Sequence, residues 1–261
     1  MTPLCDRAPA EVARREGLTL RTVLGLASLS VVFYHKSERL SALGRDYLLS
    51  PTLSDEEADV VLAVSPSLVE AQMAELDETL SYGYAEWLCA YRLLSYRLPR
   101  FGAFVFHGAV VAVGEAAYAF SGKSGVGKST HTALWERYFG ARYLNGDKPI
   151  LRVEQGRVYA YGTPWAGKCA HQQENRRLPL FGLCFLSQSP TNAIEAVTPP
   201  EAARLLMPQT IPQKDPEAAW LQMELLDTLA TSVPLWRLAC NVSREAAELS
   251  YNTLTRNEDM T

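Results

Sequence analysis

The chain has 261 residues, of which 48% are hydrophobic and 21% are charged, a globular composition long enough for one large domain or two small ones. Its 25 Lys and Arg against 29 Asp and Glu give a net charge of −4, which argues against the broad basic surface of a nucleic-acid-binding protein. The longest apolar run, near Thr22–Tyr34, is too short to cross a bilayer, so no membrane partner is expected.

The cysteines favour a reducing compartment. The chain has five of them, an odd number, with no Cys-x-x-Cys pair. The N-terminal segment carries acidic and basic side chains instead of the apolar core of a secretory signal. These features predict a cytoplasmic protein in which most cysteines are small buried side chains.

The first part of the chain, residues 1–100, is predicted to form a smaller α+β lobe. Leu18–Phe33 is rich in Val, Leu and Thr and is typical of a strand, and Ala58–Val64 is a second predicted strand. Tyr84–Leu98 has a helical period and ends before Pro99. The side chains predicted to face the core from this helix are Tyr84, Leu88, Tyr91 and Leu94. Those predicted to be solvated are Glu86, Arg92 and Arg97.

The second part, residues 101–261, is predicted to form a larger domain. Ala103–Val113 is expected to be one long strand that contains His107, and Ala116–Phe120 is expected to be a short buried strand. A glycine-rich loop follows, and then a helix over Thr130–Tyr138 with Gly140 as its C-cap.

The remaining predicted elements follow this helix. They are strands near Arg142–Leu144, Ile150–Val153, Arg157–Tyr161, Leu180–Leu186 and Leu235–Cys240, and helices over Pro216–Ala230 and Ser243–Leu254. A further helix start is indicated by Thr198, two prolines and Glu201, which together have the pattern of a capping box. Because strands outnumber helices around the glycine-rich loop, the predicted fold class is a strand-rich α/β (α+β) domain and not a simple doubly wound sheet.

Residues 122–129 read G-K-S-G-V-G-K-S and match the phosphate-loop pattern G-x-x-x-x-G-K-[ST] at every fixed position. The glycines let the loop turn its N–H groups toward phosphate oxygens, and the following helix adds its positive end. Lys128 is expected to reach the β- and γ-phosphates, and the Ser129 hydroxyl is expected to hold Mg²⁺. The expected nucleotide-binding residues are Gly122, Lys123, Ser124, Gly125, Val126, Gly127, Lys128, Ser129 and Thr130.

Two absent motifs narrow the class of nucleotide-binding protein. The sequence has no N-K-x-D or T-K-x-D guanine-reading motif, which argues against a GTP-specific switch protein. It also has no long hydrophobic run ending in Asp-Glu, the arrangement that most motor ATPases use to polarise water. Since the loop itself reads phosphates, ATP is the expected donor and GTP stays open.

Asp147 and His107 are candidate catalytic residues. Phosphoryl transfer needs an acid to hold Mg²⁺ or to accept the proton of the attacking hydroxyl, and Asp147 lies just beyond the loop helix. The alternative is a simple turn aspartate, because Asn145-Gly146-Asp147 is a good turn sequence. His107 ends an apolar run, so its residue type alone favours a core histidine.

Three basic residues follow the loop around Trp165. Lys168, Arg176 and Arg177 could clamp a phosphate in the transition state, and the alternative is that they are solvated loop charges.

With these residues placed, the chain resembles the catalytic domain of HPr kinase/phosphorylase and, more closely, a group of bacterial HPr-kinase-like proteins of uncertain substrate. The matching segments are Phe106–Ala109, Ser124–Thr132, Leu144–Pro149, Tyr161–Lys168 and Val233–Asn241. The likeness to the smaller group runs from about Tyr82 to the end, and the likeness to true HPr kinases from about His107 to Asp147.

The resemblance implies a nucleotide domain similar to that of phosphoenolpyruvate carboxykinase, with ATP and Mg²⁺ as cofactors. In HPr kinases a His-Gly precedes the loop and a pair of aspartates follows the loop helix. Carried over, Asp147 becomes the base or metal ligand, and His107 lies close enough to tune it. HPr kinases assemble as multimers, so the resemblance leaves a homo-oligomer open.

Three departures from the family pattern matter. Gly146 stands where the first aspartate of the pair is usual, the C-terminal signature of true HPr kinases is not recognisable, and Lys123 stands at a usually non-basic position. Lys123 also suggests the deviant phosphate loop of partition-type ATPases, whose extra lysine reaches the partner's nucleotide. Their loop lies near the N-terminus, whereas here about 120 residues precede it.

The leading hypothesis is therefore a kinase that moves the γ-phosphoryl group of ATP to a hydroxyl group. The acceptor would be a Ser of a peptide or protein, or a small hydroxylated metabolite. The alternative is a nucleotide-responsive binding or regulatory module with little turnover, which Gly146 in place of an acid favours. A phosphorylase-type reversal is weaker, because the matching C-terminal signature is missing.

Overall fold

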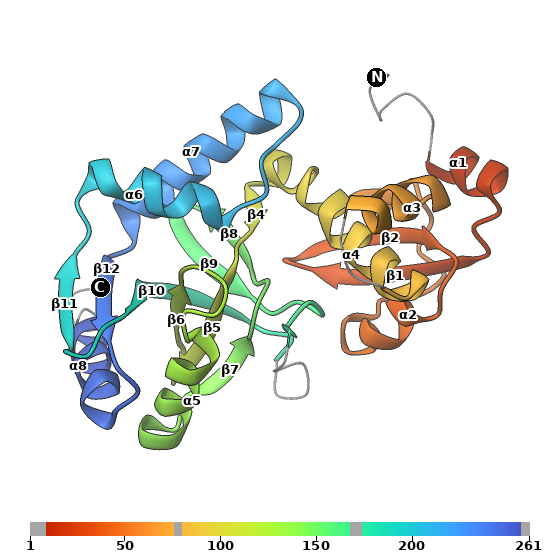
Figure 1. The fold of residues 1–261 in the computed structure, drawn as a ribbon. Helices are drawn as coiled ribbons and strands as arrows, with labels where there is room; N and C mark the ends of the chain where they lie inside the picture. Colours follow the sequence, from red (N-terminus) through yellow and green to blue (C-terminus); the bar gives the residue numbers. More distant parts are fainter. Residues whose placement is uncertain (1–8, 76–79, 168–173, 257–261) are drawn as a thin grey trace. The chain divides into compact units, whose positions relative to one another are not determined.

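The computed structural model describes residues 9–75, 80–167 and 174–256 (Figure 1). The chain divides into two compact units, Met1–Arg97 and Leu98–Thr261. Across the described ranges, no helix combines the length and the apolar character that crossing a membrane requires.

The N-terminal unit is built on a three-stranded sheet. β1 (Leu20–Leu26) and β2 (Leu29–His35) pair antiparallel, and β3 (Val60–Ala63) pairs parallel to β2. The region Leu18–Phe33 is strand-forming as predicted, but it holds two strands, because the chain turns back at Ala27 and Ser28. These two residues take φ values of 51° and 62°, a conformation for which hairpin turns normally use Gly or Asn, so neither residue type signals the turn.

The α-helices described in this unit are α1 (Pro9–Glu16), α2 (Arg39–Leu43), α3 (Pro66–Glu75) and α4 (Tyr82–Ser95), with a short 3-10 helix, η1, at Arg45–Tyr47. The buried side of α4 differs from the predicted one. Leu94 is buried as predicted, but Tyr84 is 37% exposed and Glu86 is fully buried. The Glu86 carboxylate accepts the backbone N–H groups of Lys36 and Ser37 at 2.7 and 2.8 Å. Because these bonds satisfy a buried carboxylate, the prediction of a solvated Glu86 is wrong.

The larger unit contains a nine-stranded sheet within the described residues. Its strands are β4 (Ala103–Val105), β5 (Gly108–Val113), β6 (Ala116–Ser121), β7 (Arg142–Asn145), β8 (Ile150–Glu154), β9 (Arg157–Tyr161), β10 (Arg177–Gln188), β11 (Ala193–Ala196) and β12 (Leu235–Cys240). The main order is β4-β8-β9-β10-β6-β5-β7, with β12 also paired to β10 and β11 paired to β12. The first residues of β10 pair antiparallel with β9, and its second half pairs parallel with both β6 and β12.

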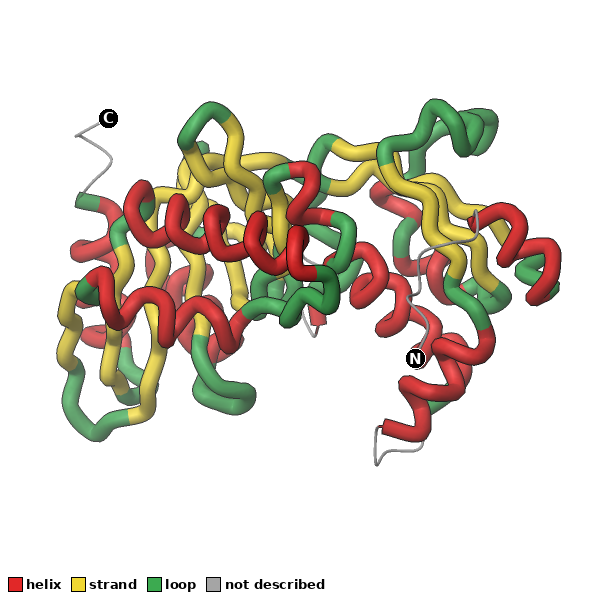
Figure 2. The backbone as a smooth tube through the Cα atoms, turned by 90° about the horizontal axis from the view of Figure 1, so that it is seen from above, coloured by secondary structure: helices red, strands yellow, loops and turns green. Residues whose placement is uncertain are grey.

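Helices cover both faces of this sheet. Figure 1 shows α6 (Pro199–Leu206) and α7 (Pro216–Ser232) on one side of the strands, and α5 (Lys128–Phe139) and α8 (Arg244–Thr255) on the other. Figure 2, seen from above, shows α6 and α7 lying in front of the strands. Two short 3-10 helices, η2 (Leu98–Phe101) and η4 (Met207–Gln209), complete the described helices of the unit.

The strand residues alternate between two hydrophobic cores, as the period of two in a strand requires. On β6, Ala117 and Ala119 pack into the core under α6 and α7, and Tyr118 and Phe120 pack into the core under α5 and α8. Trp135 of α5 is fully buried in the second core. The predicted fold class, a mixed α/β fold with a strand-rich sheet around the phosphate loop, is confirmed.

One predicted strand is broken at a functionally interesting place. Ala103–Val113 forms two strands, β4 and β5, which pair with different neighbours. Between them, the Phe106 N–H donates to Pro149 O at 3.0 Å and the His107 N–H donates to Gln209 O at 2.7 Å. The prediction of one long strand is wrong because these two N–H groups leave the regular pairing of the sheet.

The remaining predicted strands and helices of this unit lie where expected, to within a few residues at their ends. The capping box at Thr198 and Glu201 is present at the start of α6. The cysteines described are free thiols, with Cys89 and Cys184 buried and Cys240 half-buried, whereas Cys5 and Cys169 lie outside the described residues.

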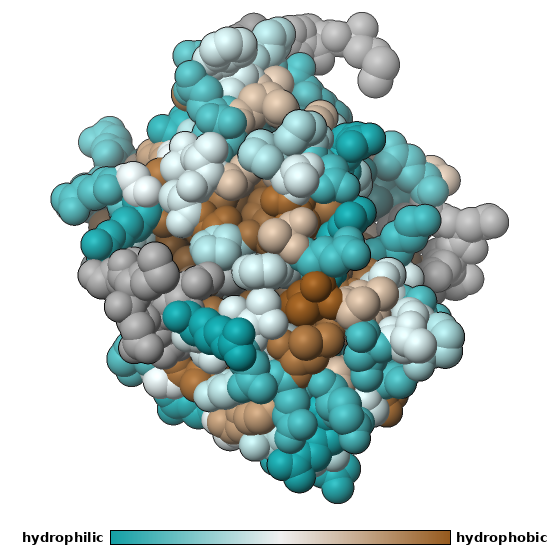
Figure 3. Space-filling view, turned by 90° about the vertical axis from the view of Figure 1, so that its left-hand side faces the viewer, coloured by the Kyte–Doolittle hydropathy of each residue, from teal (hydrophilic) through white to brown (hydrophobic). Residues whose placement is uncertain are grey.

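Figure 3 shows hydrophobic residues gathered toward the middle of one face of the molecule, with hydrophilic residues around them. In the described part of the larger unit, the large hydrophobic side chains that stay exposed are Met207, Trp220, Met223 and Val242. The first three belong to η4 and α7, and Val242 belongs to the turn between β12 and α8.

Candidate functional site

The glycine-rich loop joins β6 to α5 in a tightly curled conformation. Gly122, Gly125 and Gly127 take φ values of 140°, 77° and 109°, a region that other residues rarely adopt. A Cβ at Gly122 would lie 3.0 Å from Leu186 O of β10, so the close approach of the neighbouring strand also requires glycine there. Gly127 is the N-cap of α5, which turns the free N–H groups and the positive end of this helix toward the loop.

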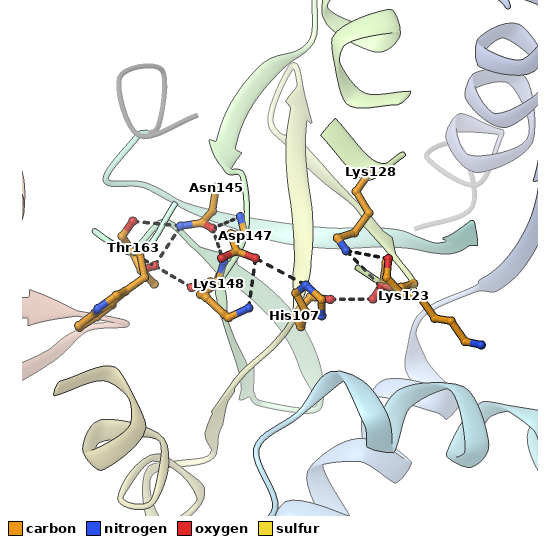
Figure 4. A network of polar contacts seen from close by, with 10 residues as sticks. His107, Lys123, Lys128, Asn145, Asp147, Lys148 and Thr163 are labelled. Carbon is orange, nitrogen blue, oxygen red and sulfur yellow. Dashed lines mark hydrogen bonds and ion pairs between the residues drawn. The ribbon is translucent and has the colours of Figure 1, made fainter. Parts of the chain in front are cut away.

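Lys128 is folded over the loop that precedes it. Its Nζ donates to Gly122 O at 3.1 Å and to Lys123 O at 3.4 Å (Figure 4). Burial lowers the pKa of Lys128, and Lys148 acts in the same direction, whereas the Asp147 carboxylate raises it. The ammonium group therefore lies in the electrostatic range of Asp147 as well as on the loop.

The other loop residues are open to solvent. Lys123, Ser124, Gly125, Ser129 and Thr130 are exposed, and Val126 is partly buried. The Lys123 side chain points away from the polar network and only its backbone carbonyl takes part in it (Figure 4). An exposed loop beside a helix N-terminus has the form of an anion-binding surface.

Asp147 lies in a turn that is held by hydrogen bonds to the side chain of another residue, Asn145. The side-chain oxygen of buried Asn145 accepts the N–H groups of Asp147 and Lys148 at 2.9 and 2.8 Å. The Asn145 amide nitrogen donates to both the backbone and the hydroxyl oxygen of Thr163 at 3.0 Å. Asp147 is therefore in a turn, as the alternative interpretation proposed, but its carboxylate does not make the turn.

The Asp147 carboxylate faces two basic side chains from different segments. Its Oδ1 lies 3.1 Å from Lys148 Nζ and 3.6 Å from His107 Nε2 (Figure 4). The loop at 162–167 packs against Asp147, since a Cβ at Gly167 would lie 3.0 Å from the Asp147 Cβ. The Lys148 N–H also donates to Trp165 O at 3.0 Å, so this second loop fixes the backbone beside the carboxylate.

His107 is half-buried and connects the two halves of the site. Its carbonyl accepts the Ser121 hydroxyl of β6 at 2.7 Å, directly before the phosphate loop. Burial lowers the pKa of His107 to about 4, with Lys148 and Lys128 acting in the same direction and Asp147 opposing them. The imidazole is therefore neutral at pH 7, and its approach to Asp147 is a polar contact and not an ion pair.

The structure thus places Asp147 near His107 and within the electrostatic influence of Lys128, the three residues expected to be catalytic. The arginines of the predicted clamp have acidic partners of their own. Arg176 is paired with Glu115 and Glu174, and Arg177 with Glu154. Both arginines are therefore held in pairs at the protein surface, as the solvated alternative expected, and Lys168 lies outside the described residues.

Four residues of the network were not singled out from the sequence. Asn145, Lys148 and Thr163 lie inside the segments 144–149 and 161–168 that carry the family resemblance, so those segments were their signal. The fourth is Gln209 of η4, whose carbonyl oxygen accepts the His107 N–H. It lies about 100 residues further along the chain, and no local pattern indicates it.

The oxygen donors at the site suit Mg²⁺. A hydroxyl at Ser129 and a carboxylate at Asp147 are the hard ligands that this ion prefers. Within the described ranges, no three or more His, Cys, Asp or Glu side chains group as a metal site. The two donors therefore fit an ion that takes its other ligands from phosphates and water, as Mg²⁺ commonly does.

Comparison with known proteins gives a distant structural likeness. No family model and no curated protein matches the sequence. The structure of the HPr(Ser) kinase/phosphatase from Coxiella burnetii is similar to this chain, with 14% identity and a TM-score of 0.34. The match covers 60% of this chain and 90% of that one. A likeness this distant assigns neither an activity nor a substrate to the chain.

Proposed function

We propose that this protein is an ATP-dependent phosphotransferase that moves the γ-phosphoryl group to a hydroxyl acceptor. The observation that carries the proposal is the Asp147 carboxylate. The turn is closed by Asn145 and not by this carboxylate, which raises the pKa of Lys128 on the phosphate loop. Phosphoryl transfer recurrently uses a phosphate-loop lysine together with a residue that orients the attacking group or accepts its proton, and Asp147 can take the second role.

In the proposed reaction, the acceptor oxygen attacks the γ-phosphorus and the bond from this phosphorus to the β,γ-bridging oxygen breaks. Asp147 accepts the acceptor's proton, and ADP leaves with the bond electrons. Lys128 exchanges its loop carbonyls for phosphate oxygens, and the N–H groups at the start of α5 bind the remaining phosphate charge. Neutral His107 lies beside the carboxylate on the side of β5, with its Nε2 3.6 Å from Asp147 Oδ1.

Ser129 and Asp147 would hold Mg²⁺, which when bound would neutralise phosphate charge. The acceptor is a Ser of a peptide or protein, or a small hydroxylated metabolite. We place the enzyme in the cytoplasm, consistent with free thiols at the cysteines that the structure describes.

The test compares two variants by turnover and by binding. Lys128→Ala is expected to abolish ADP formation from ATP in the presence of cell extract, with the fold intact by circular dichroism. Asp147→Asn is expected to lower turnover by about a hundred-fold or more while changing the Kd for Mg-ATP by less than about three-fold. Equal losses in turnover and affinity for Asp147→Asn would point to metal binding alone, and a fully active Lys128→Ala would end the proposal.

A second candidate function is a nucleotide-responsive binding module with little turnover. Two observations favour it: Gly146 replaces an acid, and Lys148 Nζ lies 3.1 Å from the same carboxylate that would act as base. Tight binding of ATP with no phosphorylated product in any extract would support this module over the enzyme.

A further inference from the structure

A cavity lies on the side of the phosphate loop away from Asp147. Its volume is about 480 Å³, and its walls come from the first turns of α5 and from the ends of β10 and β12. The loop contributes Gly125 to Gly127, and Thr130 and Leu134 come from α5. Neither Asp147 nor His107 lines it, so this cavity is separate from the polar network in Figure 4.

The topology makes this a natural binding position. β10 runs parallel to both β6 and β12, so the carboxyl ends of three strands meet at this edge. Ligands of α/β proteins bind at such carboxyl ends, and a cavity of about this volume can enclose much of a small organic molecule. The phosphate loop follows β6 at the same edge, so the cavity opens directly beside the predicted phosphate site.

The lining of the cavity is uncharged. Among the described residues that form it, none is Asp, Glu, Lys or Arg. His131 is buried at 3% exposure, and its Nε2 is 2.9 Å from the neutral Ser250 hydroxyl. Leu134, Leu186 and Val242 add apolar surface. A phosphate group would find no counter-charge here, whereas a flat, neutral heterocycle would find apolar walls.

We propose that this cavity binds the nucleoside of the donor nucleotide and that the base is adenine. The inference rests on the proposed function and adds a second part to the same site. It also orients the nucleotide along the sheet order β12-β10-β6-β5-β7. The nucleoside lies over β10 and β12, the phosphates cross the loop after β6, and the γ-phosphate reaches His107 before β5 and Asp147 after β7.

The choice of adenine follows from the polar groups in the lining. Guanine presents an N1–H and an amine on one edge, and a carboxylate is the acceptor best suited to both; the lining offers none. The polar groups present are the amides of Gln188 and Asn241. Their nitrogens already donate to Gly125 O at 3.4 Å and to Pro190 O at 3.1 Å, so their oxygens are the groups left to accept adenine's amine.

The experiment is calorimetric titration of the full chain with Mg-ATP, Mg-GTP and Mg-tripolyphosphate, which carries the three phosphates without a nucleoside. We expect ATP to bind at least about ten-fold more tightly than tripolyphosphate and about five-fold more tightly than GTP. ATP and tripolyphosphate with equal affinity would overturn the nucleoside site and leave the proposed function standing. A chain that binds none of the three would overturn both proposals, and a preference for GTP would overturn the assignment of adenine.

Two variants locate the effect. Ser189→Trp fills the cavity and is expected to reduce ATP affinity to that of tripolyphosphate. Val242 is 74% exposed, so its substitution should be tolerated by the fold. Val242→Ala is expected to weaken ATP binding about three-fold while tripolyphosphate binding stays the same. The matched control, Met223→Trp on α7, adds a similar side chain across the sheet and should change neither affinity. Unchanged ATP binding in both cavity variants would overturn the inference.

Discussion

Asn145 and Asp147 divide two tasks that a single turn residue often combines. The Asn145 side chain closes the turn through its oxygen and binds Thr163 of a second loop through its nitrogen, and it is fully buried while doing so. Asp147, two residues on, keeps a carboxylate that is partly exposed. Because a buried amide with three or four partners holds one geometry, the orientation of Asp147 depends on Asn145.

Asn145→Ala is therefore expected to lower the free energy of unfolding by about 2–3 kcal/mol, because it leaves buried donors and acceptors without partners. Thr163→Val, which keeps the shape but removes the hydroxyl, is a matched partner and should cost about 1–2 kcal/mol. Urea unfolding of both variants measures these losses. A loss below about 0.5 kcal/mol for Asn145→Ala would mean that water replaces the amide and that Asp147 is not held by it.

His107 provides a prediction about pH. Since burial lowers its pKa to about 4, the imidazole does not change charge between pH 5.5 and 8. His107→Gln is therefore expected to reduce ATP turnover without changing the shape of the pH–rate profile over that range. The check is turnover of wild type and variant at half-unit steps of pH. If wild-type turnover falls below about pH 6.5 and the variant loses this fall, His107 acts as a titrating base.

At the scale of elements, the parts of the fold that the sequence predicts are those with local signals. Glycine spacing marks the phosphate loop, Gly140 ends α5, and Thr198 with Glu201 starts α6. The long strand predicted over Ala103–Val113 is wrong, and its interruption involves a partner distant in sequence, Gln209, which accepts the His107 N–H. The strand-forming region Leu18–Phe33 contains a local hairpin turn at Ala27 and Ser28, which neither residue type signals.

The candidate site likewise contains residues that local sequence patterns predict and contacts that only the fold creates. Lys128 and Ser129 follow from a local motif, and Asp147 from its place after the loop helix. The contact between His107 and Asp147 needs β5 and β7 to be neighbours, which no local pattern reports. The cavity beside the loop could not be predicted, because it is formed by the phosphate loop, α5 and the ends of β10 and β12, which are far apart in the sequence.

The phosphate loop allows a matched pair of glycine substitutions. Gly122 and Gly125 both have positive φ, so alanine is strained at either position by about 1 kcal/mol. Only at Gly122 would the new Cβ meet a backbone atom, Leu186 O, at 3.0 Å. Gly122→Ala is therefore expected to cost about 1–2 kcal/mol more than Gly125→Ala, as measured by thermal unfolding. Equal costs would mean that β10 and the loop separate easily.

At the scale of the whole molecule, the chain keeps several histidines neutral by burying them. His35 lies in the N-terminal unit, where burial lowers its pKa, and His107 and His131 lie in the larger unit with pKa values lowered to about 4. In the unfolded chain a histidine titrates near 6.5. Between about pH 4 and 6.5 the unfolded state therefore binds more protons than the folded state, so stability rises with pH in this window and is lost on acidification.

His131 is the sharpest test of this effect, because it is 3% exposed and its Nε2 lies 2.9 Å from the neutral Ser250 hydroxyl. A shift from 6.5 to about 4 corresponds to about 3 kcal/mol of stability that is present at pH 7 and lost by pH 4. His131→Gln keeps a polar atom near Ser250 and cannot take up a proton. Its free energy of unfolding should therefore fall less steeply than that of wild type between pH 6.5 and 4, by about 1.4 kcal/mol per pH unit at most. Parallel pH curves for the two proteins would show that His131 takes up its proton at the same pH in the folded and unfolded chain, and the cavity wall beside the phosphate loop would then gain a charge below about pH 6.5.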